Sequence, residues 1–146
     1  MTDIKRGDFL VSQIKQLSDR TLQKMLRDGG IEDLNGPQGR ILSVLWQEDS
    51  LSISELSNRT SLAKTSLTTM LDRLVERNYI NRVFDNLDKR QVKITLTDKA
   101  KALKGDYDRI SKDMNEVLYK GFTKEEVSQL ESWLEKVRIN LEGGLK

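Results

Sequence analysis

The sequence of 146 residues contains no cysteine and no histidine. Without cysteine, the chain has no disulfide, no thiol nucleophile and no cysteine-based redox sensor, which is compatible with a reducing cytoplasm. Without histidine, no imidazole can act as a general base, a metal ligand or a pH switch. No titratable pair has catalytic spacing, so we expect that the protein is not an enzyme and binds no cofactor or metal. A site for a hard cation made of carboxylates alone stays possible in principle.

Long apolar segments are also missing from the sequence. No run reaches the length of about 18 apolar residues that spans a membrane, and residues 1–10 lack the apolar core of a signal peptide. We therefore expect a cytoplasmic protein without a membrane partner. Hydrophobic residues make up 36% of the chain and charged residues 33%, a balance that indicates a core shared with a partner chain.

Residues 52–96 give the clearest structural signal. Ser52 and Glu55 have capping-box spacing, which predicts a short helix that ends near Ser61. Asn78 suits the left-handed end of a second helix, and the alternation that runs to Leu96 predicts two strands joined by a charged tip. This order is that of a helix-turn-helix followed by a β-hairpin wing. The second helix has one apolar stripe, formed by Leu67, Met70, Leu71 and Leu74.

The other side of the second helix carries hydroxyl groups. Four hydroxyl residues within five positions are poor helix formers, so helix propensity alone does not explain them. Hydroxyls and free N–H groups at the positive end of a helix dipole suit base edges and phosphates, and we expect this helix in the major groove of DNA. The residues predicted to contact DNA are Lys64, Thr65, Ser66, Thr68, Thr69, Arg73, Arg77, Lys89 and Arg90.

Basic residues are concentrated in the same segment. Residues 59–93 carry a net charge of +4, whereas the whole chain carries +2, and a duplex attracts such a patch. Simpler readings stay open for each group. The hydroxyl residues could be only an exposed face, and the wing tip only a solvated turn. Arg73 and Arg77 could pair with Asp72, Glu76 or an acidic residue elsewhere in the chain.

Further helix signals flank this segment. Asn35 with Gln38 and Thr123 with Glu126 have capping-box spacing, and Thr97 can cap a long helix. The helix after Asn35 is almost wholly apolar for two turns, so we expect it at the centre of the fold. The polar connection at 47–51 leaves room for a brief strand beside the wing.

Apolar faces at both ends of the chain predict a homodimer. The series from Ala100 to Val117 has heptad-like spacing, which requires a helical partner. We expect a mainly α fold with a small β-hairpin wing, organised as one domain over 1–146. The winged helix-turn-helix lobe would cover 36–96, and dimerisation helices 1–30 and 97–146. Its two reading helices would lie about one duplex turn apart on a pseudo-palindrome.

The chain resembles the MarR (multiple-antibiotic-resistance regulator) family of winged-helix transcription regulators over nearly its full length. The strongest matching run is the wing, from Arg82 through Asp88, Lys89 and Arg90 to Thr97. The resemblance implies that Asp88 braces the wing and that Arg90 reaches into the minor groove. Insertion has a physical reason, because a narrow minor groove concentrates negative potential.

The same resemblance implies a small aromatic effector, bound in a crevice beside the winged lobe. Trp46 and Tyr107 are the candidate ligand-binding residues, although core or interface packing is the simplest reading of both and of Trp133. We therefore expect a homodimeric, sequence-specific regulator of transcription, mainly a repressor, that a small molecule releases from double-stranded DNA. The alternative is that the winged lobe docks an acidic protein. A third hypothesis, an enzyme that uses carboxylates alone, has no sequence motif in its favour.

Overall fold

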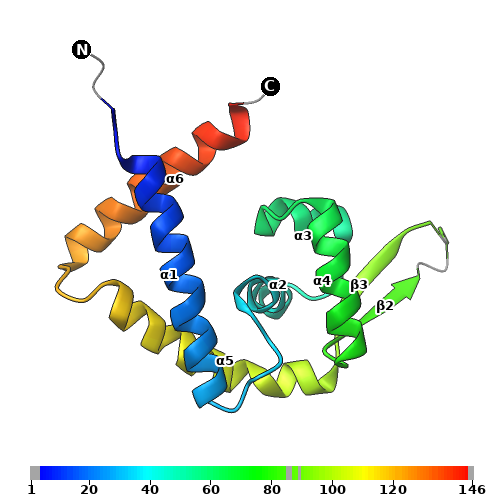
Figure 1. Cartoon of the computed structure of the whole chain (residues 1–146). Helices are drawn as coiled ribbons and strands as arrows, with labels where there is room; N and C mark the ends of the chain where they lie inside the picture. Colours follow the sequence, from blue (N-terminus) through cyan, green and yellow to red (C-terminus); the bar gives the residue numbers. More distant parts are fainter. Residues whose placement is uncertain (1–3, 85–86, 89, 145–146) are drawn as a thin grey trace. The chain divides into compact units, whose positions relative to one another are not determined.

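The computed structural model describes residues 4–84, 87–88 and 90–144 and confirms the mainly α fold with a small sheet (Figure 1). The chain forms two compact units, residues 1–111 and 112–146, and each is described by itself. The elements are α1 (Gly7–Asp28), α2 (Gly36–Gln47), β1 (Leu51–Ser52), α3 (Ile53–Thr60), α4 (Lys64–Glu76), β2 (Ile80–Phe84), β3 (Val92–Leu96), α5 (Asp98–Leu118) and α6 (Lys124–Gly143).

Side-chain caps set where several helices begin. Asn35, Ser52 and Thr123 each form a complete capping box at the start of α2, α3 and α6, as their spacing predicts. Thr97 Oγ1 accepts a hydrogen bond from the backbone amide of Ala100 at 3.2 Å, which caps α5. These local hydrogen bonds satisfy N–H groups that have no partner within the helix, so the boundaries follow directly from the sequence.

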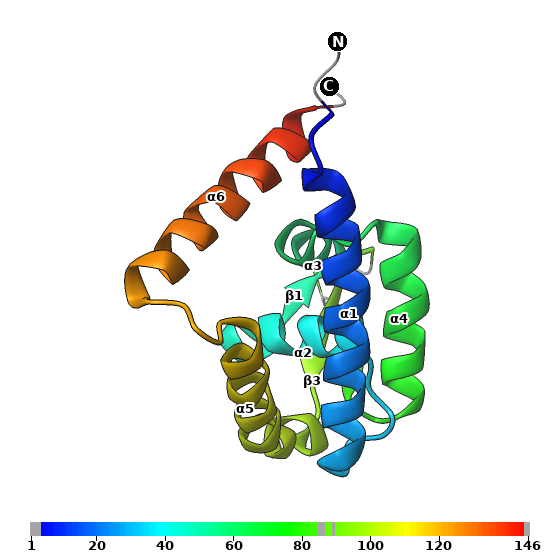
Figure 2. The same ribbon diagram turned by 60° about the vertical axis from the view of Figure 1, so that its left-hand side comes forward.

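The three strands form an antiparallel sheet in the order β1-β3-β2 (Figures 1 and 2). Leu51 of β1 pairs with Ile94, and Ile80 of β2 pairs with Leu96. The brief strand expected beside the wing is therefore present. Asn78 has a φ of 64°, the left-handed conformation predicted for it, and this residue lets the chain leave α4 and enter β2 at once.

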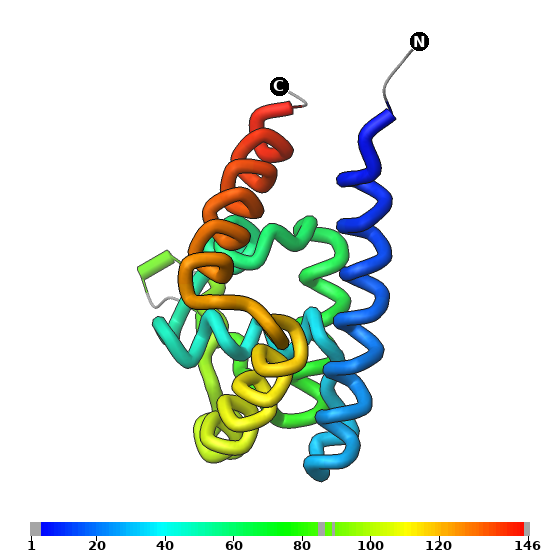
Figure 3. The backbone as a smooth tube through the Cα atoms, turned by 90° about the vertical axis from the view of Figure 1, so that its left-hand side faces the viewer, coloured from blue at the N-terminus to red at the C-terminus, as the bar shows by residue number. Residues whose placement is uncertain are grey.

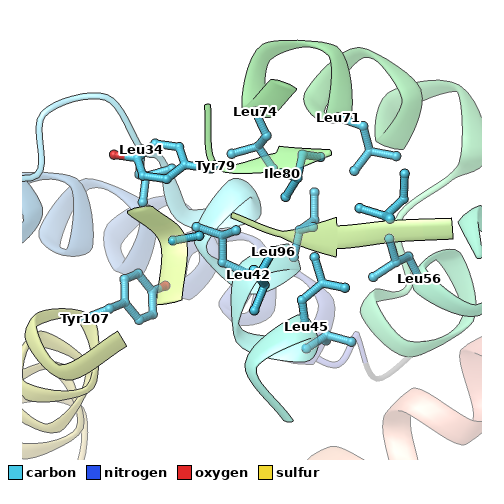
Figure 4. Packing of buried hydrophobic residues seen from close by; sticks show 14 of the residues in the cluster. Leu34, Leu42, Leu45, Leu56, Leu71, Leu74, Tyr79, Ile80, Leu96 and Tyr107 are labelled. Carbon is cyan, nitrogen blue, oxygen red and sulfur yellow. The ribbon is translucent and has the colours of Figure 1, made fainter. Parts of the chain in front are cut away.

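The core of the first unit lies around α2, as predicted. Leu42 and Leu45 of α2 pack with Leu71 of α4 and with Ile80 and Leu96 of the sheet (Figure 4). Leu42, Leu71 and Ile80 are fully buried, and burial of each such side chain contributes about 2 kcal/mol. This packing fixes which face of α4 points inward and which face is left for a ligand.

Helix α2 also packs closely on α5 within the first unit. The rings of Trp46 and Tyr107 have centroids 5.2 Å apart, and Trp46 Nε1 donates to the Ala100 carbonyl at 3.0 Å. A Cβ built on Gly39 would lie 2.7 Å from Tyr107 Cζ, which is too close for any residue except glycine. The aromatic pair and the glycine together join the winged helix-turn-helix lobe to the long helix α5.

The second unit contains the end of α5, a turn and α6 (Figure 3). Gly121 has a φ of 83° in this turn, which is the helix break predicted there. The rings of Tyr119 and Phe122 pack edge to face, and Tyr119 Oη donates to Glu131 Oε2 at 3.0 Å. Trp133 on α6 is 59% exposed, so packing inside the second unit does not account for it, and interface packing fits.

Candidate nucleic-acid interface

The faces of α4 divide as the sequence predicts. Leu67, Leu71 and Leu74 are completely buried, and Met70 is half-buried beside them. The side opposite this stripe and its flanks are exposed. The exposed candidate DNA-contacting residues on α4 are Lys64, Thr65, Ser66, Thr68, Thr69 and Arg73.

Two of the hydroxyl groups already donate to their own helix. Thr68 Oγ1 donates to the Lys64 carbonyl at 2.9 Å, and Thr69 Oγ1 donates to the Thr65 carbonyl at 3.4 Å. This bonding uses the hydroxyl hydrogen and leaves the oxygen lone pairs free to accept. In this rotamer, both threonines can therefore accept a hydrogen bond from the exocyclic amino group of adenine or cytosine.

Helix α4 begins without a side-chain cap. Ala63 occupies the N-cap position and makes no capping hydrogen bond, so the first N–H groups of α4 are not satisfied by a side chain there. The helix dipole places partial positive charge at the same end, next to exposed Lys64. This end of the helix therefore suits a phosphate oxygen.

A groove of about 320 Å³, lined mainly by polar residues, lies between the start of α2 and α4. Arg73 lines this groove, and within the described ranges its side chain forms no ion pair. Asp72, one of its expected acidic neighbours, instead pairs with Arg82 of β2. The geometry therefore favours an available Arg73 over the structural ion pair. The full lining of the groove is Asn35, Gln38, Ser66, Thr69, Met70 and Arg73.

Arg77 behaves differently from Arg73. It is half-buried, and its guanidinium donates to the Asp33 carbonyl and, at 3.3 Å, to Gln38 Oε1. These hydrogen bonds hold Arg77 against the connection between α1 and α2. The geometry favours a structural role for Arg77, and a contact with DNA stays a prediction.

The wing places Asp88 and Arg90 in direct contact. Asp88 Oδ1 accepts from the Arg90 backbone amide at 3.0 Å and from Arg90 Nε at 3.2 Å. A role of Asp88 as a brace of the wing stays a prediction. The Arg90 side chain is 92% exposed, so its guanidinium retains most of its donors for a ligand. Lys89, the other predicted residue of the tip, lies outside the described residues.

Ion pairs attach the wing to the helices, and the sequence alone does not identify their partners. Arg82 of β2 pairs with Asp72 of α4, and Lys93 Nζ of β3 lies 3.5 Å from Glu55 Oε1 of α3. The hydrogen bonds from Ser52, with help from Lys93, lower the pKa of Glu55. Opposite charges were the only available signal, and charge alone does not select partners.

Trp46 and Tyr107, the candidate effector residues, lie against each other between α2 and α5. Tyr107 is 6% exposed, and its burial raises the pKa of its phenol. The structure therefore gives both residues a packing role, which was their simplest reading. No helix in the described part of the chain is long and apolar enough to cross a membrane.

Comparison with known proteins supplies the context of this surface. The MarR family model matches residues 34–92, which contain α2 to the start of β3. Multiple antibiotic resistance protein MarR of Salmonella typhimurium is 31% identical over 129 residues, 88% of each protein. The transcriptional regulator TtmR of Methylorubrum extorquens is 43% identical over 76 residues, which are 52% of this chain but only 39% of TtmR.

A solved structure supports the same assignment. The crystal structure of a mutant MarR from Escherichia coli, complexed with operator DNA, matches with a TM-score of 0.80 at 28% sequence identity. The match covers 93% of this chain and 99% of that chain. Both the sequence and the fold match those of MarR proteins, and the chain belongs to the MarR family of DNA-binding transcription regulators.

Proposed function

We propose that this protein is a homodimeric, sequence-specific regulator that binds a pseudo-palindromic operator in double-stranded DNA and acts mainly as a repressor. One observation carries the proposal. A helix with a buried leucine stripe presents its hydroxyl face to solvent, and exposed Arg90 extends from the wing of the same lobe. The relative complexed with operator DNA has this fold.

The proposed roles follow from exposure and chemistry. Lys64 and the start of α4 bind phosphate, and the hydroxyl residues Thr65, Ser66, Thr68 and Thr69 face the base edges of the major groove. Arg73 binds phosphate from the groove between α2 and α4. Arg90, held by Asp88, enters the adjacent minor groove. Lys89 is proposed to contact DNA from its charge alone. Arg77 contributes by holding the end of α4.

The exposed apolar side chains of α1 and α6 support the homodimer. Phe9, Ile14 and Leu17 on α1, and Trp133 and Leu141 on α6, are each more than half exposed in the single chain. Such surfaces are covered in stable proteins, and a two-fold dimer covers the same patch on both copies. We assign 1–30 and 97–146 to dimerisation and 36–96 to DNA binding.

Release by a small aromatic molecule is the proposed regulation. The joint that contains Trp46 and Tyr107 connects α2 of the DNA-binding lobe to α5. A ligand that opens this joint would favour a conformation in which the two lobes no longer fit both half-sites. Such a ligand acts only through its preference for that conformation.

Selection of duplexes from a random pool by the purified protein tests the proposal. We expect enrichment of an inverted repeat, with an affinity that falls steeply as salt rises, because bound phosphates release counterions. Recovery of no common sequence, with salt-dependent binding to an acidic protein instead, would favour the alternative that the winged lobe docks a protein. Membership of the MarR family favours DNA.

A further inference from the structure

A cluster of four residues joins the C-terminal end of α4 to the first turn of α5. It consists of Asp33, Arg77, Tyr79 and Lys99, and we call it the α4–α5 clasp. Lys99 Nζ donates to the Arg77 carbonyl at 2.7 Å and lies 4.0 Å from Asp33 Oδ2. The same ammonium lies 4.2 Å from the centre of the Tyr79 ring. Lys99 therefore contacts each of the other three members.

Asp33 is the second centre of the clasp. Tyr79 Oη donates to Asp33 Oδ1 at 2.7 Å, and the Arg77 guanidinium donates to the Asp33 carbonyl. Tyr79 is 4% exposed, so its hydroxyl needs this acceptor. The clasp thus connects three segments far apart in sequence: the α1–α2 connection, the end of α4 and the start of α5.

The carbonyl groups at the end of α4, the helix proposed to read the bases, depend on these contacts for their hydrogen-bond donors. The last carbonyl groups of a helix have no partner within it, and a cation near them is favourable. Lys99 fills this role for Arg77, and Thr97 Oγ1 donates to the Asn78 carbonyl at 2.7 Å. Two residues at the start of α5 therefore hold the chain where it leaves α4.

The hydrogen bonds of the clasp can fix the direction of α4, which apolar packing alone cannot do. The leucine stripe decides which face of α4 is buried, but hydrophobic burial is not directional and tolerates small rotations of the helix. Hydrogen bonds with fixed donors and acceptors restrict the angle of the helix as well. A clasp at one end of α4 is therefore well placed to set its direction relative to α5.

We propose that the α4–α5 clasp sets the angle between the reading helix and α5, and thereby the separation of half-sites that the dimer accepts. Asp33, Tyr79 and Lys99 are positioning residues in this proposal and touch no base. The second part rests on the proposed function, because α5 belongs to the dimerisation region. The first part concerns one chain only and can be tested without DNA.

Double electron–electron resonance measures the distance between two spin labels. With one label on α4 and one on α5, this distance reports the angle between the two helices. The sequence has no cysteine, so Thr68→Cys and Lys104→Cys would be the only labelling sites, one on α4 and one on α5. Dilution with unlabelled protein restricts the signal to one chain. We expect a single narrow distance distribution in the parent, and a broader or shifted distribution after Lys99→Met or Tyr79→Phe.

Lys101→Met is the matched control, because Lys101 is exposed on the same helix and the change removes the same charge. It should leave the distribution as in the parent. A cooperative thermal transition in each variant would show that it is folded. The same narrow distribution in folded Lys99→Met and Tyr79→Phe proteins would overturn the proposal.

Operators with altered spacing test the consequence for DNA. The probe is the duplex that the unaltered protein selects, with one base pair inserted or removed between its half-sites. We expect Lys99→Met to weaken binding to the selected duplex about fivefold, and to weaken binding to the altered duplexes much less, since the coupling is lost. Affinity for a single half-site should stay within about twofold, because the base contacts are intact.

An unchanged preference for the selected spacing in the Lys99→Met protein would overturn the link between the clasp and half-site separation. Failure of the unaltered protein to select any duplex would overturn the proposed function and with it this link. The spin-label distances would still decide whether the clasp sets the helix angle, so the two failures are distinguishable.

Discussion

At the scale of single residues, the arginines of the lobe differ in how far their guanidinium groups are exposed to a ligand. Arg82 pairs with Asp72, and Arg77 donates to the connection before α2, whereas Arg73 and Arg90 are exposed. The sequence shows four similar cations near one helix and gives no local pattern that distinguishes them. The distinction comes from acceptors far away in the chain, such as the Asp33 carbonyl, which only the fold brings within reach.

Arg90→Ala should weaken binding to specific DNA by about 1–3 kcal/mol, because a guanidinium in the minor groove is lost. Fluorescence anisotropy with the selected duplex measures this change. Lys101→Ala, which removes one positive charge from exposed α5, is the control and should have a much smaller effect. Equal affinity of the Arg90→Ala and unaltered proteins would remove the wing from the proposed interface.

Tyr79→Phe should show how the clasp contributes to stability. At neutral pH, loss of the hydrogen bond to Asp33 should lower the free energy of unfolding by about 1–2 kcal/mol. Burial, together with Asp33, raises the pKa of Tyr79 in the folded protein. The contribution of the Tyr79 hydroxyl to the free energy of unfolding is therefore complete below the pKa of a tyrosine in the unfolded chain, about 10. This contribution is lost as the pH rises above that value.

Urea denaturation at a series of pH values measures this difference. The stability gap between the unaltered and Tyr79→Phe proteins should narrow above about pH 10. Both proteins have the same lysines, so the comparison removes their titration. A gap that stays constant or widens in this range would contradict the assigned cause.

At the scale of helices and strands, most starts and ends could be predicted from the sequence. Capping boxes at Asn35, Ser52 and Thr123 and the left-handed residue Asn78 act within a few positions, so their signals are local. Contacts between elements could not be predicted in this way. Gly39 and Tyr107 belong to different helices, and no spacing rule reveals that a tyrosine ring occupies the space above that glycine.

Gly39→Ala should destabilise the protein by about 1–3 kcal/mol, because the added methyl group overlaps the Tyr107 ring and forces α2 and α5 apart. Gly105→Ala is the matched control, since a Cβ there meets no atom within 4 Å. That change should stabilise α5 by about 0.5–1 kcal/mol. Thermal unfolding measures both, and equal effects would mean that the close approach of the helices is unimportant.

At the scale of the whole molecule, we infer that two copies of this chain bind adjacent grooves of one duplex. The family and fold support the claim, and the exposed apolar sides of α1 and α6 supply surfaces for the second copy. The sequence predicts this organisation from periodicity, because amphipathic faces repeat over many residues. The operator and the effector depend on a few side chains at the surface, for which periodicity carries no information.

Footprinting of the selected duplex with dimethyl sulfate and hydroxyl radicals shows whether two copies bind in this way. We expect two protected stretches of major groove about 10 base pairs apart, each flanked by protected minor groove. In the Arg90→Ala protein, only the flanking protection should disappear. A single protected stretch, or flanking protection that persists in the Arg90→Ala protein, would rule out this mode of binding.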